Sequence, residues 1–425
     1  MDTRTVIESL EKVSQKTDRT LRVWIKGQKQ DLPVHRIPIK HLYFNIENGR
    51  YADKMLQLRA DNPGVDIDPK SDIWRDEIYK MLKGEYKGSI EDEGTERDKV
   101  AFERLREDIK KREQLNPGIV LADGGVIDGN RRLAVLMSLE DQRFSYFDGV
   151  ILPADISAED RWRIEVGVQL GKDQQLDYSP INKLLKIRQG LLMYKSMKLP
   201  SGKRAEDMVA DALYGVSEKE VLENIDLINL IDEYLGFFKC KGQYYQVADK
   251  NERFIEALGT LKAAEGKLGL HEKAKLKVQL FIIVKEGIMS NWEIRDIKRA
   301  LGGILKARGR KSTPIQKAVD HLITHTTDPK MVRDAYTRNT QAKIVEKSET
   351  ICREFKDIFD AEKDANQPLT LAKDARAKLE TLKESLKDFK KHEDSVSIVK
   401  ELAFMKKLIR ACLSTIKLPK HKIKR

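Results

Sequence analysis

The segment GIVLADGGVIDGNRRLAVL, residues 118 to 136, decides most of what this chain is expected to fold into. Apolar residues that favour strands flank Asp123-Gly124-Gly125, and this pattern predicts a β-hairpin. From Leu133 onward the apolar residues change to helical spacing, so Asp128 to Arg132 is the turn between a strand and a helix. A helix N-terminus has unpaired N–H groups and a partial positive charge, and this turn adds two adjacent guanidinium groups. The pattern therefore predicts an anion site, with phosphate as the natural ligand.

The residues Asp128-Gly129-Asn130-Arg131-Arg132-Leu133-Ala134 resemble the signature of the ParB/sulfiredoxin-like family, which includes ParB N-terminal domains and ParB-like nucleases. In that signature a strand is followed by Gly-x-(His/Arg)-Arg and by a helix with small residues. Residues 37 to 50 resemble the family's first strand and its Asn/Arg-bearing turn. Leu115-Asn116-Pro117 resembles the end of the helix before the hairpin, and residues 178 to 183 resemble the start of the helical DNA-binding half. The resemblance covers about residues 33 to 236.

Together, the resemblance and the apolar patterns predict an α+β fold with four parts. Residues 1–155 are expected to form a ParB/sulfiredoxin-like mixed α/β domain that binds a nucleotide or phosphate, with an insertion at about 60–95. A mainly α-helical region follows. It is expected to contain a helix-turn-helix-like domain at 156–236, a helical domain at 237–335, and a helical hairpin or coiled-coil arm with a basic tail at 336–425.

Several local predictions are more specific. Residues 1–32 are expected to form a short amphipathic helix and then a strand at Leu21–Ile25. The insertion is expected to be loops or a small appendage around a helix at Trp74–Leu82. Residues 243–247 are a candidate strand. A break near Asn366-Gln367-Pro368 is expected to separate two long charged helices.

The resemblance implies a nucleotide site at the Gly-x-Arg-Arg turn, with a nucleoside triphosphate (CTP or ATP) and Mg²⁺ as the implied ligands. The candidate catalytic residues are Asp128, Arg131 and Arg132, and Asp128 is also the candidate metal ligand. The residues implied to bind the nucleotide are Gly129, Asn130, Arg131, Arg132, Asn48, Arg50, Gln169 and Lys172. The alternative interpretation is a purely structural turn whose arginines pair with local carboxylates such as Asp128.

Two departures from the family pattern limit the chemistry that the resemblance implies. Asn130 stands where sulfiredoxins carry their catalytic cysteine, so sulfinic acid repair is not expected. Partition-type ParB proteins carry a Glu-Asn-x-x-Arg segment that helps to hold the nucleotide and metal. Its nearest counterpart here, Val168-Gln169-Leu170-Gly171-Lys172, keeps some polarity but lacks the carboxylate.

Charge and composition point toward a nucleic-acid partner. The 425 residues contain 80 Lys and Arg against 68 Asp and Glu, a formal charge of +12. The candidate nucleic-acid-binding residues lie in two basic clusters: Lys306, Arg308, Arg310, Lys311, Lys420, Lys422, Lys424 and Arg425. Such clusters contact phosphate backbones in many proteins, although lysine-rich tails also serve only solubility. The three cysteines are far apart, which indicates neither a disulfide framework nor a zinc site.

Two functional hypotheses follow. In the first, the chain is a cytoplasmic, nucleoid-associated protein that binds a nucleotide at the turn and DNA elsewhere, as an NTPase switch or a metal-dependent nuclease. The predicted second helix of the helix-turn-helix unit carries Glu218, Glu220 and Glu223, an exterior poorly suited to a major groove. In the second, the chain is a non-enzymatic adaptor of a phage, plasmid or defence system, such as antiphage defence. Residues 340–416 are expected to join it to another copy or to a partner protein, and no membrane span is expected.

Overall fold

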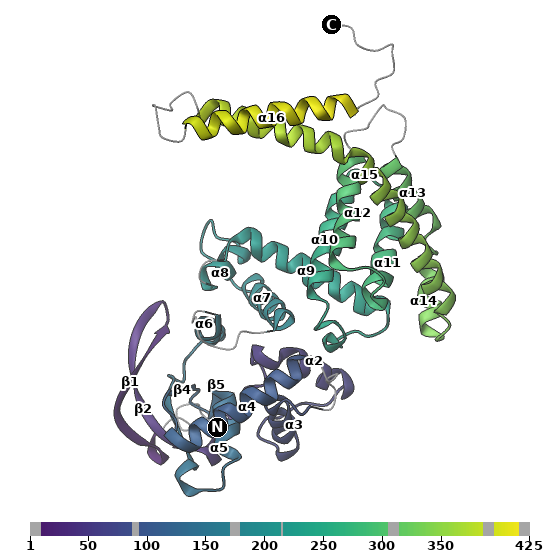
Figure 1. Cartoon of the computed structure of the whole chain (residues 1–425). Coiled ribbons are helices and arrows are strands. Elements are labelled where there is room, and N and C mark those ends of the chain that lie inside the picture. The colour runs from purple at the N-terminus through teal and green to yellow at the C-terminus, as the bar shows by residue number, and fades with distance from the viewer. Residues whose placement is uncertain are drawn as a thin grey trace. The chain divides into compact units, whose positions relative to one another are not determined.

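The computed structural model describes residues 10–86, 93–170, 179–213, 216–304, 314–385 and 395–415. A six-stranded mixed sheet with its helices comes first, and helices follow (Figure 1). The predicted α+β class is therefore confirmed at this level. The first part of the chain contains β1 (Gln15–Ile25), β2 (Gln28–Pro38), η1 (Ile39–His41), β3 (Tyr43–Phe44), η2 (Gly49–Tyr51), α2 (Ala52–Asp61), α3 (Asp72–Lys83), α4 (Glu93–Arg112), β4 (Gly118–Val120), β5 (Gly125–Asp128), α5 (Asn130–Met137), η3 (Gln142–Phe144) and β6 (Tyr146–Ile151).

The remaining described elements are helical. They are α6 (Ala158–Leu170), α7 (Pro180–Lys195), α8 (Ala205–Ala212), α9 (Glu218–Phe237), η4 (Tyr244–Val247), α10 (Asn251–Ala264), α11 (Leu270–Glu286), α12 (Asn291–Ile304), α13 (Pro314–His325), α14 (Pro329–Thr337), α15 (Ala342–Ser385) and α16 (Ser395–Thr415). Ser217 caps α9 as predicted, because its hydroxyl accepts a hydrogen bond from the Glu220 amide at 3.2 Å. No described helix is long and apolar enough to cross a membrane.

The sheet has the strand order β1-β2-β6-β4-β5-β3, and apolar cores lie on both faces of its central strands. Its β4–β6 and β3–β5 pairs are parallel and the other three pairs are antiparallel. Successive residues of a strand point to opposite faces, so Ile119 packs with α6 whereas Val120 joins the core formed with α2 to α5. Burial on both faces explains why residues 118–128 are almost continuously apolar.

The hairpin predicted at Asp123-Gly124-Gly125 is confirmed. β4 and β5 pair antiparallel on either side of it, and the Leu121 amide donates to the Gly125 carbonyl at 2.7 Å. Gly124 has a φ of +94°, and a Cβ there would overlap the His41 carbonyl oxygen. Glycine is therefore required both for the turn and for the close approach of the neighbouring backbone.

Two predictions in the first part of the chain are wrong in detail. The strand expected at Leu21 begins six residues earlier, at Gln15, because β1 pairs with β2 through polar, exposed residues that carry no apolar signal. Residues 1–9 of the expected N-terminal helix lie outside the described residues. The predicted helix at 74–82 exists as α3, but it is not an appendage, since Ile78, Met81 and Leu82 are buried in the same core as α5.

Two predictions in the helical part are also wrong. Residues 244–247 form the 3₁₀ turn η4 and not a strand, because the Tyr244 side chain is buried there and its hydroxyl contacts Asp232 on α9. Pro368 does not separate two helices: α15 runs through it from Ala342 to Ser385. A proline costs a helix about 3 kcal/mol, and the strong helix formers on both sides of this one outweigh that cost.

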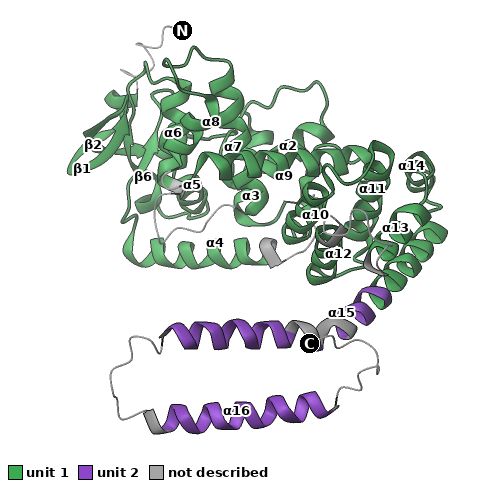
Figure 2. Ribbon diagram, turned by 90° about the horizontal axis from the view of Figure 1, so that it is seen from above, with its two compact units in different colours: residues 1–357 green, residues 358–425 purple. Residues whose placement is uncertain are grey.

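The chain divides into two compact units, residues 1–357 and residues 358–425 (Figure 2). The first unit contains the sheet, the helices α2 to α14 and the start of α15. The second contains the rest of α15 and α16. Within the first unit, α6, α7, α8 and α9 share one apolar core around Trp162 and Tyr194.

Candidate phosphate-binding site

The turn between β5 and α5 depends on glycine. Gly129 has a φ of +103°, and a Cβ there would lie 2.7 Å from Cζ of Phe147 and 3.2 Å from Nη2 of Arg132. Phe147 is fully buried, and its ring also lies against Gly118, where a Cβ would overlap it. Because neither glycine has a side chain, the Phe147 ring packs directly against the backbone at both positions. The Arg132 side chain also has room beside Gly129.

Two buried amide side chains hold this turn to the neighbouring segment of the chain. Asn130 donates from Nδ2 to the Val126 carbonyl at 2.7 Å, and its Oδ1 accepts from the Asn45 amide at 3.0 Å. Asn48 donates to the Ile127 carbonyl at 3.3 Å and accepts from the Arg50 amide at 2.9 Å. Both asparagines were predicted to bind nucleotide, and the structure places their side-chain amides in contact with backbone.

Arg131 is held by a carboxylate from α4. Its Nη2 lies 2.7 Å from Oδ1 of Asp98, whose other oxygen is 3.4 Å from Nζ of Lys54. The Arg131 side chain is only 10% exposed. Its Nε is buried and has no hydrogen-bond partner among the described residues. Since buried guanidinium N–H groups are normally paired, this donor leaves Arg131 with one unsatisfied hydrogen bond among the described residues.

Arg132 is held by its own turn. Its Nη2 lies 2.7 Å from Oδ2 of Asp128, and its Nη1 donates to the carbonyls of Asn116 and Pro117, the latter at 3.1 Å. The Asp128 side chain is 10% exposed. The pairing that the structural alternative expected between an arginine and Asp128 is therefore present. It fixes the Arg132 guanidinium without enclosing it, because both side chains also line an open cavity.

That cavity has a volume of about 550 Å³ and brings most of the predicted site together. The turn contributes Asp128, Gly129, Asn130, Arg131 and Arg132, and residues elsewhere contribute Asn48, Arg50, Arg97, Val100, Ala101, Arg104, Leu105, Asp108 and Asn116. Five arginines and two aspartates thus line one cavity. The predicted residues that line the cavity come from distant parts of the chain. Asn48 lies 77 positions before Gly125, the first residue of the strand β5 that leads into the turn.

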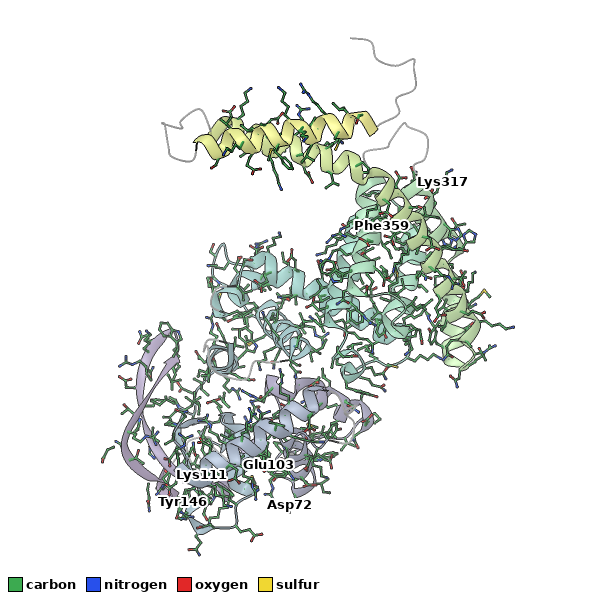
Figure 3. All side chains as sticks on the ribbon, viewed as in Figure 1. Asp72, Glu103, Lys111, Tyr146, Lys317 and Phe359 are labelled. Carbon is green, nitrogen blue, oxygen red and sulfur yellow. The ribbon has the colours of Figure 1, made fainter. Side chains whose placement is uncertain are left out.

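The wall contributed by α4 was missed by the sequence analysis. Arg97 and Arg104 are exposed, line the cavity and form no ion pair with a described residue. Val100, Ala101 and Leu105 form an aliphatic strip beside them; Glu103 and Lys111 mark the same helix in Figure 3. Positions 97, 101, 104 and 108 recur at helical spacing and so share one face of α4, but this spacing alone does not show that the face meets the turn.

A second missed feature is a buried ion pair behind the Asn48-Gly49-Arg50 turn. Nζ of Lys186 on α7 lies 2.7 Å from Oε2 of Glu165 on α6, and the other carboxylate oxygen accepts from the Gly49 amide at 2.7 Å. The two side chains are 3% and 4% exposed. The nearest counterpart of the family's segment, residues 168–172, lacks a carboxylate, and Glu165 lies one turn before it on α6.

Three residues at helical spacing on α7 hold the same segment. Asn182 donates to the Arg50 carbonyl at 3.0 Å, and Lys186 donates to the Glu47 carbonyl at 3.1 Å. Gln189 donates to the Glu47 carboxylate at 2.8 Å. One face of α7 therefore fixes the loop that carries Arg50 into the cavity.

The remaining predicted residues lie at the end of α6 or outside the part of the chain that the structure describes. Gln169 belongs to the last turn of α6, whereas Lys172 and both basic clusters, 306–311 and 420–425, lie outside the described residues. The part of the chain that the structure describes contains no group of three or more His, Cys, Asp or Glu side chains that could hold a metal ion. In comparisons with known proteins, no family model, curated protein or solved structure matches this chain.

Proposed function

We propose that the cavity at the Asp128–Arg132 turn binds the phosphate groups of a nucleotide, as the resemblance to the ParB/sulfiredoxin-like family suggests. The observation that carries the proposal is the convergence of five arginines, Arg50, Arg97, Arg104, Arg131 and Arg132, on one open cavity. Guanidinium groups bind phosphate oxygens through short, paired, charge-assisted hydrogen bonds. The N-terminus of α5 adds backbone N–H groups, which, like the guanidinium groups, donate hydrogen bonds to an anion.

A single nucleotide fits this cavity better than a nucleic-acid strand. Proteins that bind single strands stack successive bases on aromatic side chains, and none of the described residues that line the cavity is aromatic. Instead Val100, Ala101 and Leu105 offer an aliphatic surface suited to one sugar or base. The volume of about 550 Å³ is within the usual range for small-molecule sites. We therefore propose a nucleoside triphosphate such as CTP or ATP as the ligand, and DNA as a partner that binds elsewhere on the chain.

Asp128 is better suited to positioning than to holding a metal. Its Oδ2 is paired with Arg132 at 2.7 Å, and Asp108 is the one other carboxylate among the described residues that line the cavity. Mg²⁺ commonly arrives with substrate phosphates and keeps several of its waters, so it needs few ligands from the protein. Within this proposal the site acts as a nucleotide-binding switch, in which Asp128 orients Arg132 toward the phosphates.

Arg97 and Arg104 on α4 give the cleanest test, because neither is paired with a described residue and both are exposed. We expect Arg97→Gln and Arg104→Gln to keep the fold and each to weaken triphosphate binding about tenfold or more, since a charged hydrogen bond contributes about 1.5–3 kcal/mol. Arg106→Gln is the matched control, because Arg106 is on α4, pairs with Glu103 and does not line the cavity.

The measurement is calorimetric titration of the full chain with each of the four ribonucleoside triphosphates and Mg²⁺, supported by ligand-dependent shifts in melting temperature. Failure of all four to bind the unaltered protein would contradict the proposal, as would equal affinity in the cavity variants and the control. Full biological activity in Arg97→Gln and Arg104→Gln, with loss of activity on deletion of residues 340–425, would instead support the adaptor hypothesis.

A further inference from the structure

Helix α16 carries an apolar stripe whose N-terminal residues Ile398 and Leu402 are half-buried and whose C-terminal part is left exposed by the other described residues of its unit. The stripe residues are Ile398, Leu402, Met405, Ile409 and Cys412, spaced alternately four and three residues apart. This is the heptad spacing by which one helix packs along another. Met405 is 41% exposed and Ile409 is 49% exposed, and Cys412 at the end of the stripe is also exposed.

The flanks of the stripe are apolar as well. Leu408 is 50% exposed and Leu413 is 63% exposed. On the neighbouring helix of the same unit, α15, residues 371–378 are exposed and include one large apolar side chain, Leu371, whereas Leu379 and Leu382 are half-buried. Large contiguous apolar surface on a soluble helix normally marks an interface.

We propose that α16 pairs in parallel with α16 of a second copy of this chain. In the heptad, Leu402 and Ile409 occupy a positions, and Ile398, Met405 and Cys412 occupy d positions. Glu401 is then at a g position and Lys406 at the following e position. In a parallel pair these two positions face each other across the interface, so each copy's Glu401 meets Lys406 of the other.

The charge pattern favours this occupant, because Glu401 and Lys406 carry opposite charges at positions that meet in a parallel pair. One heptad after the Glu401–Lys406 contact, the same g and e positions are Leu408 and Leu413, which extend the apolar surface where the flanks are exposed. An antiparallel pair does not bring these g and e positions together. The sequence of α16 is therefore complementary to itself in one direction only.

Cys412 provides a reporter for this geometry. Residues at the same d position of a parallel pair face each other across the symmetry axis, within reach of the roughly 4.4–6.8 Å Cα separation that a disulfide needs. The other two cysteines are less accessible: Cys240 is half-buried and Cys352 is buried. Burial raises the pKa of the Cys352 thiol to about 12, which keeps it unreactive at neutral pH.

The first experiment measures the mass of the full chain in solution by sedimentation equilibrium under reducing conditions. We expect a dimer that becomes a monomer in Met405→Glu and in Ile409→Glu. Leu270→Glu is the control, since Leu270 is an exposed apolar residue on α11 in the other unit, and this variant should remain dimeric. A monomeric unaltered chain, or a dimer that survives both α16 substitutions, overturns the proposal.

The second experiment determines direction. Diamide should oxidise the two Cys412 thiols of a dimer to one disulfide, taking up their two protons and two electrons, and Cys412→Ser should abolish the covalent dimer. Glu401→Lys and Lys406→Glu should each slow this cross-linking, and the double exchange should restore it. A reversible dimer that does not cross-link through Cys412, or whose double exchange is no better than the single ones, rules out parallel pairing.

Discussion

Replacing Lys186 with methionine should destabilise the region behind the cavity at the Asp128–Arg132 turn more than replacing Lys183 on the same helix. The Lys186 ammonium lies 2.7 Å from the Glu165 carboxylate and also donates to the Glu47 carbonyl at 3.1 Å. Both charged side chains are almost completely buried. Methionine has a similar length and fills the same space, so the substitution removes charge and hydrogen bonding with little loss of packing.

The magnitude follows from the burial of the partner. Removing one member of a buried ion pair deprives the other of its counter-charge in a low-dielectric environment, and measured costs are about 3–5 kcal/mol. The Glu165 carboxylate would keep its contact with the Gly49 amide at 2.7 Å, which offsets only part of that penalty. Glu165→Gln combined with Lys186→Met removes both charges and keeps an acceptor for Gly49. The double variant should therefore be more stable than Lys186→Met alone.

Hydrogen exchange of the full chain, read for peptides covering residues 45–53 and α7, is the appropriate assay, because it reports local opening free energies in a protein with several cores. Lys183→Met is the matched control on the same helix. Lys183 is 3.7 Å from Glu220, and the two side chains are 39% and 45% exposed, so this change should cost at most about 1 kcal/mol. If Lys186→Met costs no more than Lys183→Met, or if the double variant is the least stable of all, the reasoning is wrong.

Three further predictions concern glycines and one buried acid. Gly129→Ala should cost about 2–4 kcal/mol in urea denaturation and abolish nucleotide binding, whereas Gly64→Ala, with a φ of +80° and open space around it, should cost only about 1 kcal/mol. Gly190→Ala should destabilise the protein, because the new methyl group on α7 would overlap a tryptophan ring. Gly236→Ala on α9, where no atom is nearby, should stabilise it by about 0.5–1 kcal/mol. Thermal denaturation should therefore show changes in melting temperature of opposite sign. Burial raises the pKa of Asp53, so the folded state binds its proton more tightly than the unfolded state does. Asp53→Asn should therefore be more stable than the unaltered protein at pH 7, and urea midpoints should show this advantage vanishing as the pH falls through the raised pKa and below the ordinary value of about 3.9.

The local geometry of the site could be predicted from sequence because it is made by residues close together in the chain. The turn after β5 and the hairpin before it depend on Gly124 and Gly129, whose positive φ values few other residues tolerate. A run of apolar residues broken by such glycines permits few backbone arrangements. The helix after the turn then follows from the change in apolar spacing.

The walls of the cavity could not be predicted in the same way, because they depend on tertiary packing. Arg97 and Arg104 lie more than 20 residues before the turn, and nothing local to them distinguishes their face of α4 from the other charged faces of that helix. Glu165 was missed for a related reason. A contiguous motif was expected after it, whereas the structure requires only that some carboxylate on α6 reach the Gly49 amide.

The cavity contains two kinds of arginine, and the difference has a consequence for binding. Arg131 and Arg132 are each held by a carboxylate at 2.7 Å, so their guanidinium groups are already oriented and a ligand does not have to order them. Their charge, however, is largely balanced by Asp98 and Asp128. Arg97 and Arg104 have no such partner among the described residues, and they supply the attraction that draws an anion into the cavity. Exposed charges are screened by salt, whereas buried pairs are screened much less. Any loss of ligand affinity with rising salt should therefore come mainly from Arg97 and Arg104. The geometric specificity for the ligand should come from Arg131 and Arg132 in the turn.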